Sequence, residues 1–123
     1  MATVGFEKLR VDQMSEQLAD AIWETVYGWK PLATDTVVKQ LIRSADSIGA
    51  NIAEGSGRGT YQDNRRFVRT ARGSLYETRH WLRRAFKRKL LRQDQVDALK
   101  PLMDDLSPKL NAYLKSIGPT KRK

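Results

Sequence analysis

Residues 61–89 read YQDNRRFVRTARGSLYETRHWLRRAFKRK, a stretch without proline in which apolar and small side chains recur every three or four positions. The recurring positions are Val68, Ala71, Leu75, Thr78, Leu82 and Ala85, and the stripe is widened by Phe67 and Phe86. This spacing predicts a helix over residues 60–89, with Thr60 as its N-cap. At 1.5 Å per residue the helix would be about 40 Å long.

Three further segments show the same period and predict helices over residues 8–28, 35–54 and 94–117. Their apolar stripes run from Val11 to Trp29, from Val38 to Ile52 and from Val96 to Ile117. Between the first two, Pro31 disfavours the helical conformation of Lys30, and Thr34 and Asp35 offer capping oxygens for the second helix.

Pro101 and Pro108 lie inside the last segment, where each removes a backbone hydrogen bond. We expect kinks or a local break there, although the apolar stripe continues through both positions. Four single-stripe helices with short connections predict an all-α fold: an antiparallel up-down-up-down four-helix bundle over residues 1–118, followed by a basic C-terminal tail at 119–123. Four aromatic residues lie off the stripes and would either fill a subunit interface or cover helix edges: Trp23, Tyr27, Tyr76 and Trp81.

The composition excludes several classes of protein. The chain has 123 residues, no cysteine and one histidine, His80, which excludes disulfides, thiolate zinc sites and sites that need two imidazoles. No apolar run approaches the ~20 residues that cross a bilayer, and the N-terminal sequence lacks the apolar core of a signal peptide. We therefore expect a cytoplasmic protein with no membrane partner, no cofactor, no metal and no catalytic residues.

Positive charge is concentrated in one part of the chain. The formal net charge is +9. Residues 1–57 carry 5 basic and 8 acidic side chains, whereas residues 58–92 carry 12 and 2, a net charge of +10. Such a segment would attract polyanions in a salt-dependent manner.

Projected on a helix, the basic side chains of residues 61–89 form a strip beside the apolar face. The candidate nucleic-acid-binding residues are Arg65, Arg66, Arg69, Arg72, Tyr76, Arg79, Arg83 and Lys87. Only Asp63 and Glu77 are acidic within this helix. Neutralising carboxylates would have to come from elsewhere, and the candidates are Asp97, Asp104 and Asp105.

The strip is typical of a phosphate-binding surface. Guanidinium groups bind phosphates bidentately, the row from Arg65 to Arg83 spans about 27 Å of helix, and Tyr76 could stack on a base. We therefore expect a non-enzymatic protein that binds RNA, DNA or another polyanion without reading its sequence. Two alternatives stay open: a scaffold that docks an acidic partner such as a polymerase or a ribonucleoprotein, and an enzyme that uses Glu54, Asp46 or Arg58 at a cleft between subunits.

Two motifs are set aside. Glu77-x-x-His80 has the spacing of a di-iron ligand pair, but there is no second histidine and the helical projection places both residues opposite the core. Gly55-x-Gly57-x-Gly59 is glycine-rich, yet it follows a predicted helix rather than a strand and lacks the lysine of a P-loop. We interpret it as a helix–helix connection.

Two blocks carry a family resemblance: residues 40–59, QLIRSADSIGANIAEGSGRG, and residues 67–75, FVRTARGSL, with Glu77 after them. The sequence resembles the small bacterial four-helix bundle proteins encoded in 23S ribosomal RNA intervening sequences, often labelled S23 ribosomal protein. It is also similar to the accessory variability determinant proteins of diversity-generating retroelements. The resemblance extends from Phe6 to Ile117 and departs at Asp12, where many members carry an aromatic residue.

The resemblance implies a homopentameric ring without catalysis, and in the retroelement branch the pentamer binds nucleic acid and a reverse transcriptase. The residues of the family motif are Asn51, Glu54, Gly55, Gly57, Gly73 and Ser74. We expect structural roles for them. Asn51 and Glu54 would satisfy backbone or cross-helix donors, and Gly55 would form a left-handed C-cap. Gly73 would permit close helix approach, and Ser74 would hydrogen-bond a carbonyl of its own helix.

Overall fold

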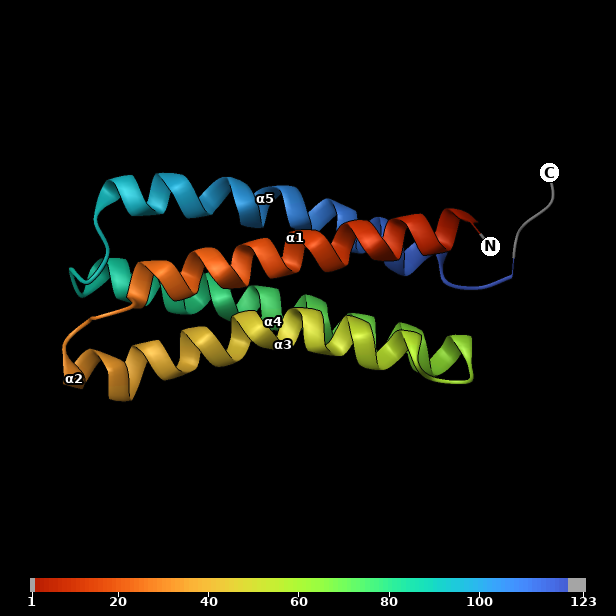
Figure 1. The fold of residues 1–123 in the computed structure, drawn as a ribbon, viewed down its shortest axis with the longest axis horizontal. Coiled ribbons are helices and arrows are strands. Elements are labelled where there is room, and N and C mark those ends of the chain that lie inside the picture. The colour runs from red at the N-terminus through yellow and green to blue at the C-terminus, as the bar shows by residue number, and fades with distance from the viewer. Residues whose placement is uncertain (1, 120–123) are drawn as a thin grey trace.

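The computed structural model describes residues 2–119, and the side chains of residues 5–119, as an all-helical chain (Figure 1). Its elements in order are α1 (Ala2–Val26), α2 (Pro31–Ala33), the π-helix η1 (Thr34–Val38), α3 (Lys39–Ser56), α4 (Tyr61–Lys87) and α5 (Gln93–Ser116). Because α2, η1 and α3 follow one another without a break, the described chain forms four long helical rods. The predicted all-α, four-helix fold is confirmed.

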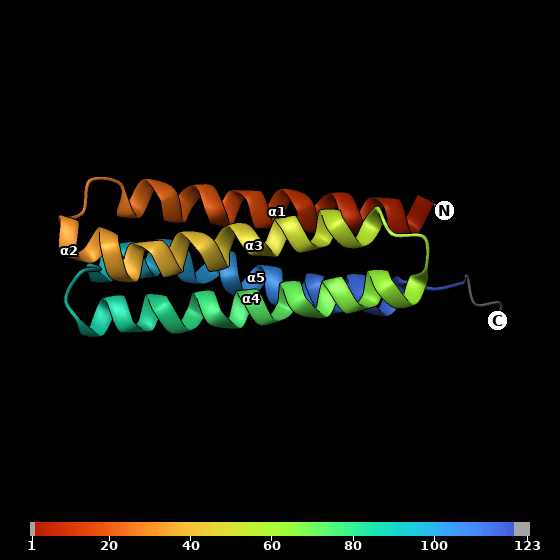
Figure 2. The ribbon, with the colours of Figure 1, turned by 90° about the horizontal axis from the view of Figure 1, so that it is seen from below.

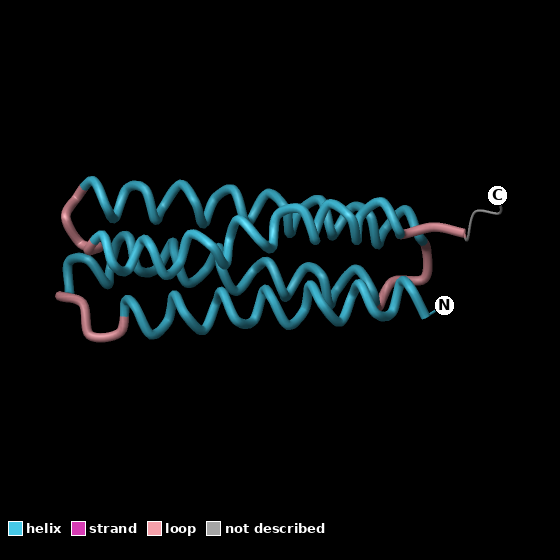
Figure 3. Tube along the Cα trace, turned by 90° about the horizontal axis from the view of Figure 1, so that it is seen from above, coloured by secondary structure: helices cyan, strands magenta, loops and turns pink. Residues whose placement is uncertain are grey.

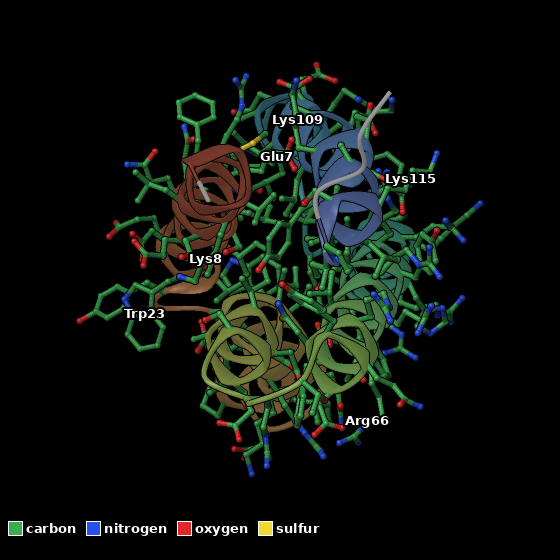
Figure 4. All side chains as sticks on the ribbon, turned by 90° about the vertical axis from the view of Figure 1, so that its right-hand side faces the viewer. Glu7, Lys8, Trp23, Arg66, Lys109 and Lys115 are labelled. Atoms are coloured by element: carbon green, nitrogen blue, oxygen red, sulfur yellow. The ribbon has the colours of Figure 1, made fainter. Side chains whose placement is uncertain are left out.

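The rods pack as an antiparallel bundle. α1 packs on α3, α3 on α4, α4 on α5, and α5 closes back on α1. The connections lie at alternating ends, and the N-terminus and the end of α5 lie at the same end (Figures 2 and 3). Viewed end-on in Figure 4, the helices surround one core, with α1 diagonally opposite α4. The outer faces of these two helices therefore point to opposite sides of the molecule.

The predicted apolar stripes line the core. Leu18, Leu41, Leu75 and Leu106 are fully buried, one from each rod, and each such side chain contributes about 1.5–3 kcal/mol relative to an exposed one. The stripe of α4 is buried at Val68, Ala71, Leu75, Thr78, Leu82 and Ala85. Phe86, assigned to the same stripe, is instead 41% exposed. It lies at the edge of the core, on the side of α4 that faces α5.

The first connection differs from the prediction. Helix α1 ends at Val26, two residues before Gly28, which has a φ of +83° that favours glycine. The second rod begins at Pro31 rather than at residue 35, so the predicted capping role of Thr34 and Asp35 is wrong. The physical reason is that proline fits the first helical position, where no amide hydrogen is needed. Thr34 Oγ1 instead donates a hydrogen bond to the carbonyl of Trp29, 3.0 Å away.

Individual residues determine where α4 begins and ends. Thr60 is the N-cap, as predicted, and its Oγ1 accepts from the amide of Asp63 at 3.1 Å. The helix ends at Lys87, two residues before the predicted end, because Lys89 adopts a φ of +62° that reverses the chain toward α5.

Helix α5 runs through Pro101 and Pro108 without a break from Gln93 to Ser116. The local break considered from the sequence is absent within this helix. Both prolines are exposed, whereas Leu99, Met103, Leu106 and Leu110 are buried. The backbone groups that the prolines leave unpaired can therefore bind water, while the buried stripe holds the helix on the core.

Among residues 2–119, none of the helices combines the length and apolar character that crossing a lipid bilayer requires. The basic tail expected from Pro119 onward falls almost entirely outside the described residues.

Candidate nucleic-acid interface

Three of the predicted basic residues face α5 rather than solvent. Arg65, Arg72 and Arg79 are seven residues apart, so they lie on one side of α4. Arg65 Nη1 donates to the carbonyl of Ile117 at 2.8 Å, where its charge also complements the C-terminal end of α5. Arg72 Nη1 donates to Asn111 Oδ1 at 3.2 Å, and Arg79 Nη1 donates to Asp104 Oδ1 at 2.9 Å. These arginines join two helices, with their positive charge partly satisfied.

Four other predicted residues form an exposed row, which we define as Arg69, Tyr76, Arg83 and Lys87. Tyr76 is 55% exposed. Among the described side chains, no carboxylate lies within 4 Å of the three cations of the exposed row. Figure 4 shows nitrogen-tipped side chains projecting from the side of α4 that faces away from α1. The exposed row is thus an uncompensated positive surface.

Arg66 lies at the N-terminal end of this surface and points outward in Figure 4. It is 3.6 Å from Asp63 Oδ1, and its guanidinium lies 4.8 Å from the ring centroid of Phe67. Arg58, in the connection before α4, lies 4.9 Å from the same ring and donates to Glu54 Oε1 at 2.8 Å. Both arginines are therefore held by local contacts.

Of the three acids considered as partners for the basic strip, only Asp104 takes part. Its two oxygens accept from Lys100 and Arg79, and these hydrogen bonds lower the pKa of the Asp104 carboxyl. Asp97 accepts from Gln93 on its own helix. Lys100 of α5 is a basic residue beside α4 that the prediction missed. The sequence does contain a signal for it, because Lys100 and Asp104 are four residues apart, the spacing of an ion pair within one helix.

The opposite side of the bundle is acidic. A groove of about 390 Å³ runs between α1 and α3, lined in part by the small residues Ser15 and Gly49. Its acidic residues are Asp12, Glu16, Asp20 and Asp46. Partial burial raises the pKa of Asp46, and the nearby Asp20 carboxylate raises it further.

The residues considered for catalysis are not gathered in one place. Asp46 lies in the acidic groove, whereas Glu54 and Arg58 pair with each other at the end of α3. Within the part of the chain that the structure describes, no group of three histidine or acidic side chains is placed to bind a metal ion. Glu77 and His80 are exposed, and Trp81 donates to Glu77 Oε2 at 3.4 Å and packs edge-on against His80.

Comparison with known proteins places this bundle in a family. Residues 7–112 match the family described as 23S rRNA-intervening sequence protein, which is most of the chain. The chain belongs to this family. No curated protein matches the sequence. A solved structure from Bacteroides thetaiotaomicron, described as a protein with unknown function from the S23 ribosomal protein family, superposes with a TM-score of 0.78. The two share 22% identity over 89% of this chain and 99% of the other, a level that shows the fold alone.

Three residues of the family motif, Asn51, Gly55 and Ser74, lie where α3 packs on α4, whereas Glu54, Gly57 and Gly73 are exposed. Asn51 Nδ2 donates to the carbonyl and to Oγ of Ser47, at 2.8 and 2.9 Å. Ser47 Oγ is 3.0 Å from Ser74 Oγ, and Ser74 donates to the carbonyl of Thr70 in its own helix, as predicted. Thr78 Oγ1 lies 3.0 Å from Ser44 Oγ and continues this ladder. The hydroxyl groups of these residues thus link α3 to α4 in this member of the 23S rRNA-intervening sequence protein family.

Two expectations about the family glycines are wrong. Gly55 is not a left-handed C-cap, because it lies inside α3, which ends at Ser56 with Gly57 as a right-handed C-cap. Gly73 does not permit close helix approach, since a Cβ there would meet no atom within 4 Å. Gly55 has that role instead: its Cβ would lie 2.6 Å from Asn64 Oδ1 and 2.9 Å from Phe67 Cβ. Sequence spacing alone did not show which glycine faces the neighbouring helix.

Asp12, where the sequence departs from the family resemblance, has a partner within its own helix. Asp12 forms an ion pair with Lys8, one turn earlier on α1. Both charges act on Tyr113, a buried tyrosine of α5 whose pKa is raised by burial. An acidic residue fits here because Lys8 neutralises it, and α1 continues N-terminal to the pair as far as Ala2.

Proposed function

We propose that the protein binds nucleic acid through the exposed cations of α4 and has no catalytic activity. The observation that carries the proposal is the exposed row, in which Arg69, Arg83 and Lys87 have no carboxylate within 4 Å among the described side chains. A solvated surface helix ordinarily mixes both signs of charge. From Arg69 to Lys87 the row extends about 27 Å along the helix, long enough to contact several successive phosphates.

The contacts of Arg65, Arg72 and Arg79 with α5 divide the predicted strip into two parts. These three residues fix the position of α4, while the exposed row contributes the charge available to a ligand. The row offers contacts to phosphate and, at Tyr76, a ring for stacking, so we expect affinity with little sequence preference.

We also propose the homopentameric ring that the family resemblance implies. Supporting it, five large apolar side chains of α1, the turn after it and α2 are each more than half exposed: Phe6, Leu9, Trp23, Tyr27 and Leu32. Since α1 lies diagonally opposite α4, assembly through α1 leaves the exposed row in solvent. Five copies at +9 each would carry about +45, so weak contacts could add through multivalency.

The test is fluorescence anisotropy of labelled single-stranded RNA and duplex DNA over a salt series. The variant Arg69→Glu/Arg83→Glu/Lys87→Glu should weaken binding at least about tenfold and flatten the dependence of affinity on salt. Lys30→Glu/Lys39→Glu/Arg43→Glu is the matched control. It makes the same change of net charge at exposed positions outside α4 and should retain most of the affinity.

Equal losses in both triple variants would mean that only net charge matters and would contradict the assignment of the site. If the wild-type protein binds neither nucleic acid near about 50 mM salt, where phosphate contacts are strong, nucleic-acid binding is excluded. The exposed row would then be the docking surface for an acidic protein.

A further inference from the structure

A small pocket opens between α4 and the first turns of α5, beside the exposed row. It encloses about 200 Å³. Its apolar lining consists of Leu82, Phe86, Leu91, Val96 and Met103. Leu82, Leu91 and Met103 are buried and form the floor, whereas Phe86 is 41% exposed and forms a wall. The reversal of the chain at Lys89 brings Leu91 and Val96 against α4 and so builds the pocket.

The rim of this pocket is cationic, with Arg79, Arg83 and Lys100 in its lining. Arg79 and Lys100 share the carboxylate of Asp104, at 2.9 and 2.7 Å, and Arg83 has no carboxylate within 4 Å in the described structure. Three cations against one anion leave the rim positively charged. The pocket therefore combines an apolar floor with a rim that favours an anionic group.

Size and charge together restrict the occupant. The volume is below the about 300–1,000 Å³ of typical small-molecule sites, so the pocket suits one ring-sized apolar group rather than a whole cofactor. That group must be linked to an anion within reach of Arg83 or Lys100. Arg83 is also a member of the exposed row, which continues along α4 through Tyr76 to Arg69, about 21 Å away at helical rise. An occupant that also contacts the exposed row would be part of a longer polyanion.

We infer that the pocket takes one unstacked base of a single-stranded nucleic acid, with the adjoining phosphates on Arg83 and Lys100. The inference rests on the proposed function and makes it more specific. Phe86 offers a ring face for stacking, and such contacts accept any base because every base has a π-face. The bases of a duplex are already stacked and paired, so a duplex reaches the exposed row but not the pocket.

The experiment compares three fluorescein-labelled probes at equal salt: an oligothymidine, an abasic backbone of the same length, and a duplex. The wild-type protein should bind the oligothymidine about tenfold more tightly than the abasic backbone. Phe86→Ala should abolish this preference and leave the affinities for the abasic backbone and the duplex unchanged. Val96→Phe, which fills the pocket without removing a charge, should have the same effect. Circular dichroism melting checks that both variants fold.

Tyr61→Ala is the matched control, because Tyr61 is an exposed aromatic residue at the start of α4, outside the lining of the pocket, and its loss should change none of the three affinities. Equal binding of the oligothymidine and the abasic backbone, unaffected by Phe86→Ala, would overturn the base pocket while leaving the phosphate-binding row intact. Absence of binding to all three probes would overturn the proposed function and the pocket with it. Displacement of the oligothymidine by an acidic, phenylalanine-containing peptide that depends on Phe86 but not on Arg69 would assign the pocket to a protein partner instead.

Discussion

At the scale of the residue, two glycines of similar sequence context have opposite environments. Gly55 lies against α4, where a Cβ would come within 3 Å of both Asn64 and Phe67. Gly73 lies on the exposed face of α4, where a Cβ would meet nothing within 4 Å. Glycine in a helix interior lowers stability relative to alanine by roughly 0.5–1 kcal/mol. Packing against α4 requires a glycine at Gly55 despite this cost, whereas no contact within the chain requires one at Gly73.

We expect Gly55→Ala to lower the free energy of unfolding by about 1–3 kcal/mol, because α3 and α4 must separate to accept the methyl group. Gly73→Ala should raise it by about 0.5–1 kcal/mol. Urea unfolding followed by circular dichroism measures both. A destabilising Gly73→Ala would contradict the exposed position of Gly73 and would show that another molecule packs on this helix surface.

At the scale of the element, the contact between α1 and α3 includes a repulsive charge pair. Asp46 of α3 lies near Asp20 of α1, and partial desolvation and the Asp20 carboxylate both raise the pKa of Asp46. The folded protein therefore holds this proton more tightly than the unfolded chain. Between the ordinary pKa of aspartate and the raised value, the stability of the folded state falls as pH rises.

Asp46→Asn should raise the melting temperature at pH 7, where the wild-type carboxylate is charged. The gain should correspond to no more than about 1 kcal/mol, because the site is partly solvated. It should vanish near pH 3, where the wild-type carboxyl is protonated and neutral like the amide. Asp105→Asn, an exposed change of the same charge on α5, is the control. A gain independent of pH, or one equal in both variants, would contradict the Asp46–Asp20 repulsion.

At the scale of the whole molecule, positive and negative charge lie on different sides. The exposed row lies on α4, the acidic groove lies between α1 and α3, and α1 carries a further set of exposed apolar side chains. A closed ring of odd order needs two different, complementary patches on each copy. The exposed apolar side chains of α1 offer one patch that assembly can bury while the exposed row stays in solvent, as the proposed ring requires.

Light scattering should therefore give about five times the chain mass of 14.1 kDa. Leu9→Glu/Trp23→Glu should lower the mass, because it places charges in the exposed apolar surface of α1. Tyr76→Glu, a change of an exposed aromatic residue on α4, should leave the mass unchanged. A monomeric wild-type protein would exclude the ring while leaving the nucleic-acid surface to be tested separately.

Most of the fold could be predicted from the sequence, because helix periodicity, proline and N-caps act over a few neighbouring residues. The place of Thr60 before a proline-free stripe predicts its role as N-cap, and the stripe of α4 is buried as expected. Pro31 predicts a boundary before the second helix, but the structure has it inside that helix, because its backbone suits the first helical position. The prolines of α5 raised an expectation of breakage that packing of the surrounding stripe overrode.

The candidate site could be predicted only in outline. The sequence by itself determined that one helix carries an excess of arginine beside its apolar face, since angular position follows from spacing. Only the tertiary structure decided which of these arginines bind α5, that Gly55 rather than Gly73 lies against a neighbouring helix, and that Lys100 joins Arg83 around an apolar pocket. The physical reason is that these contacts depend on the rotation and position of one helix against another. The side chains of both helices determine them together, and the periodicity of a single segment does not contain that information.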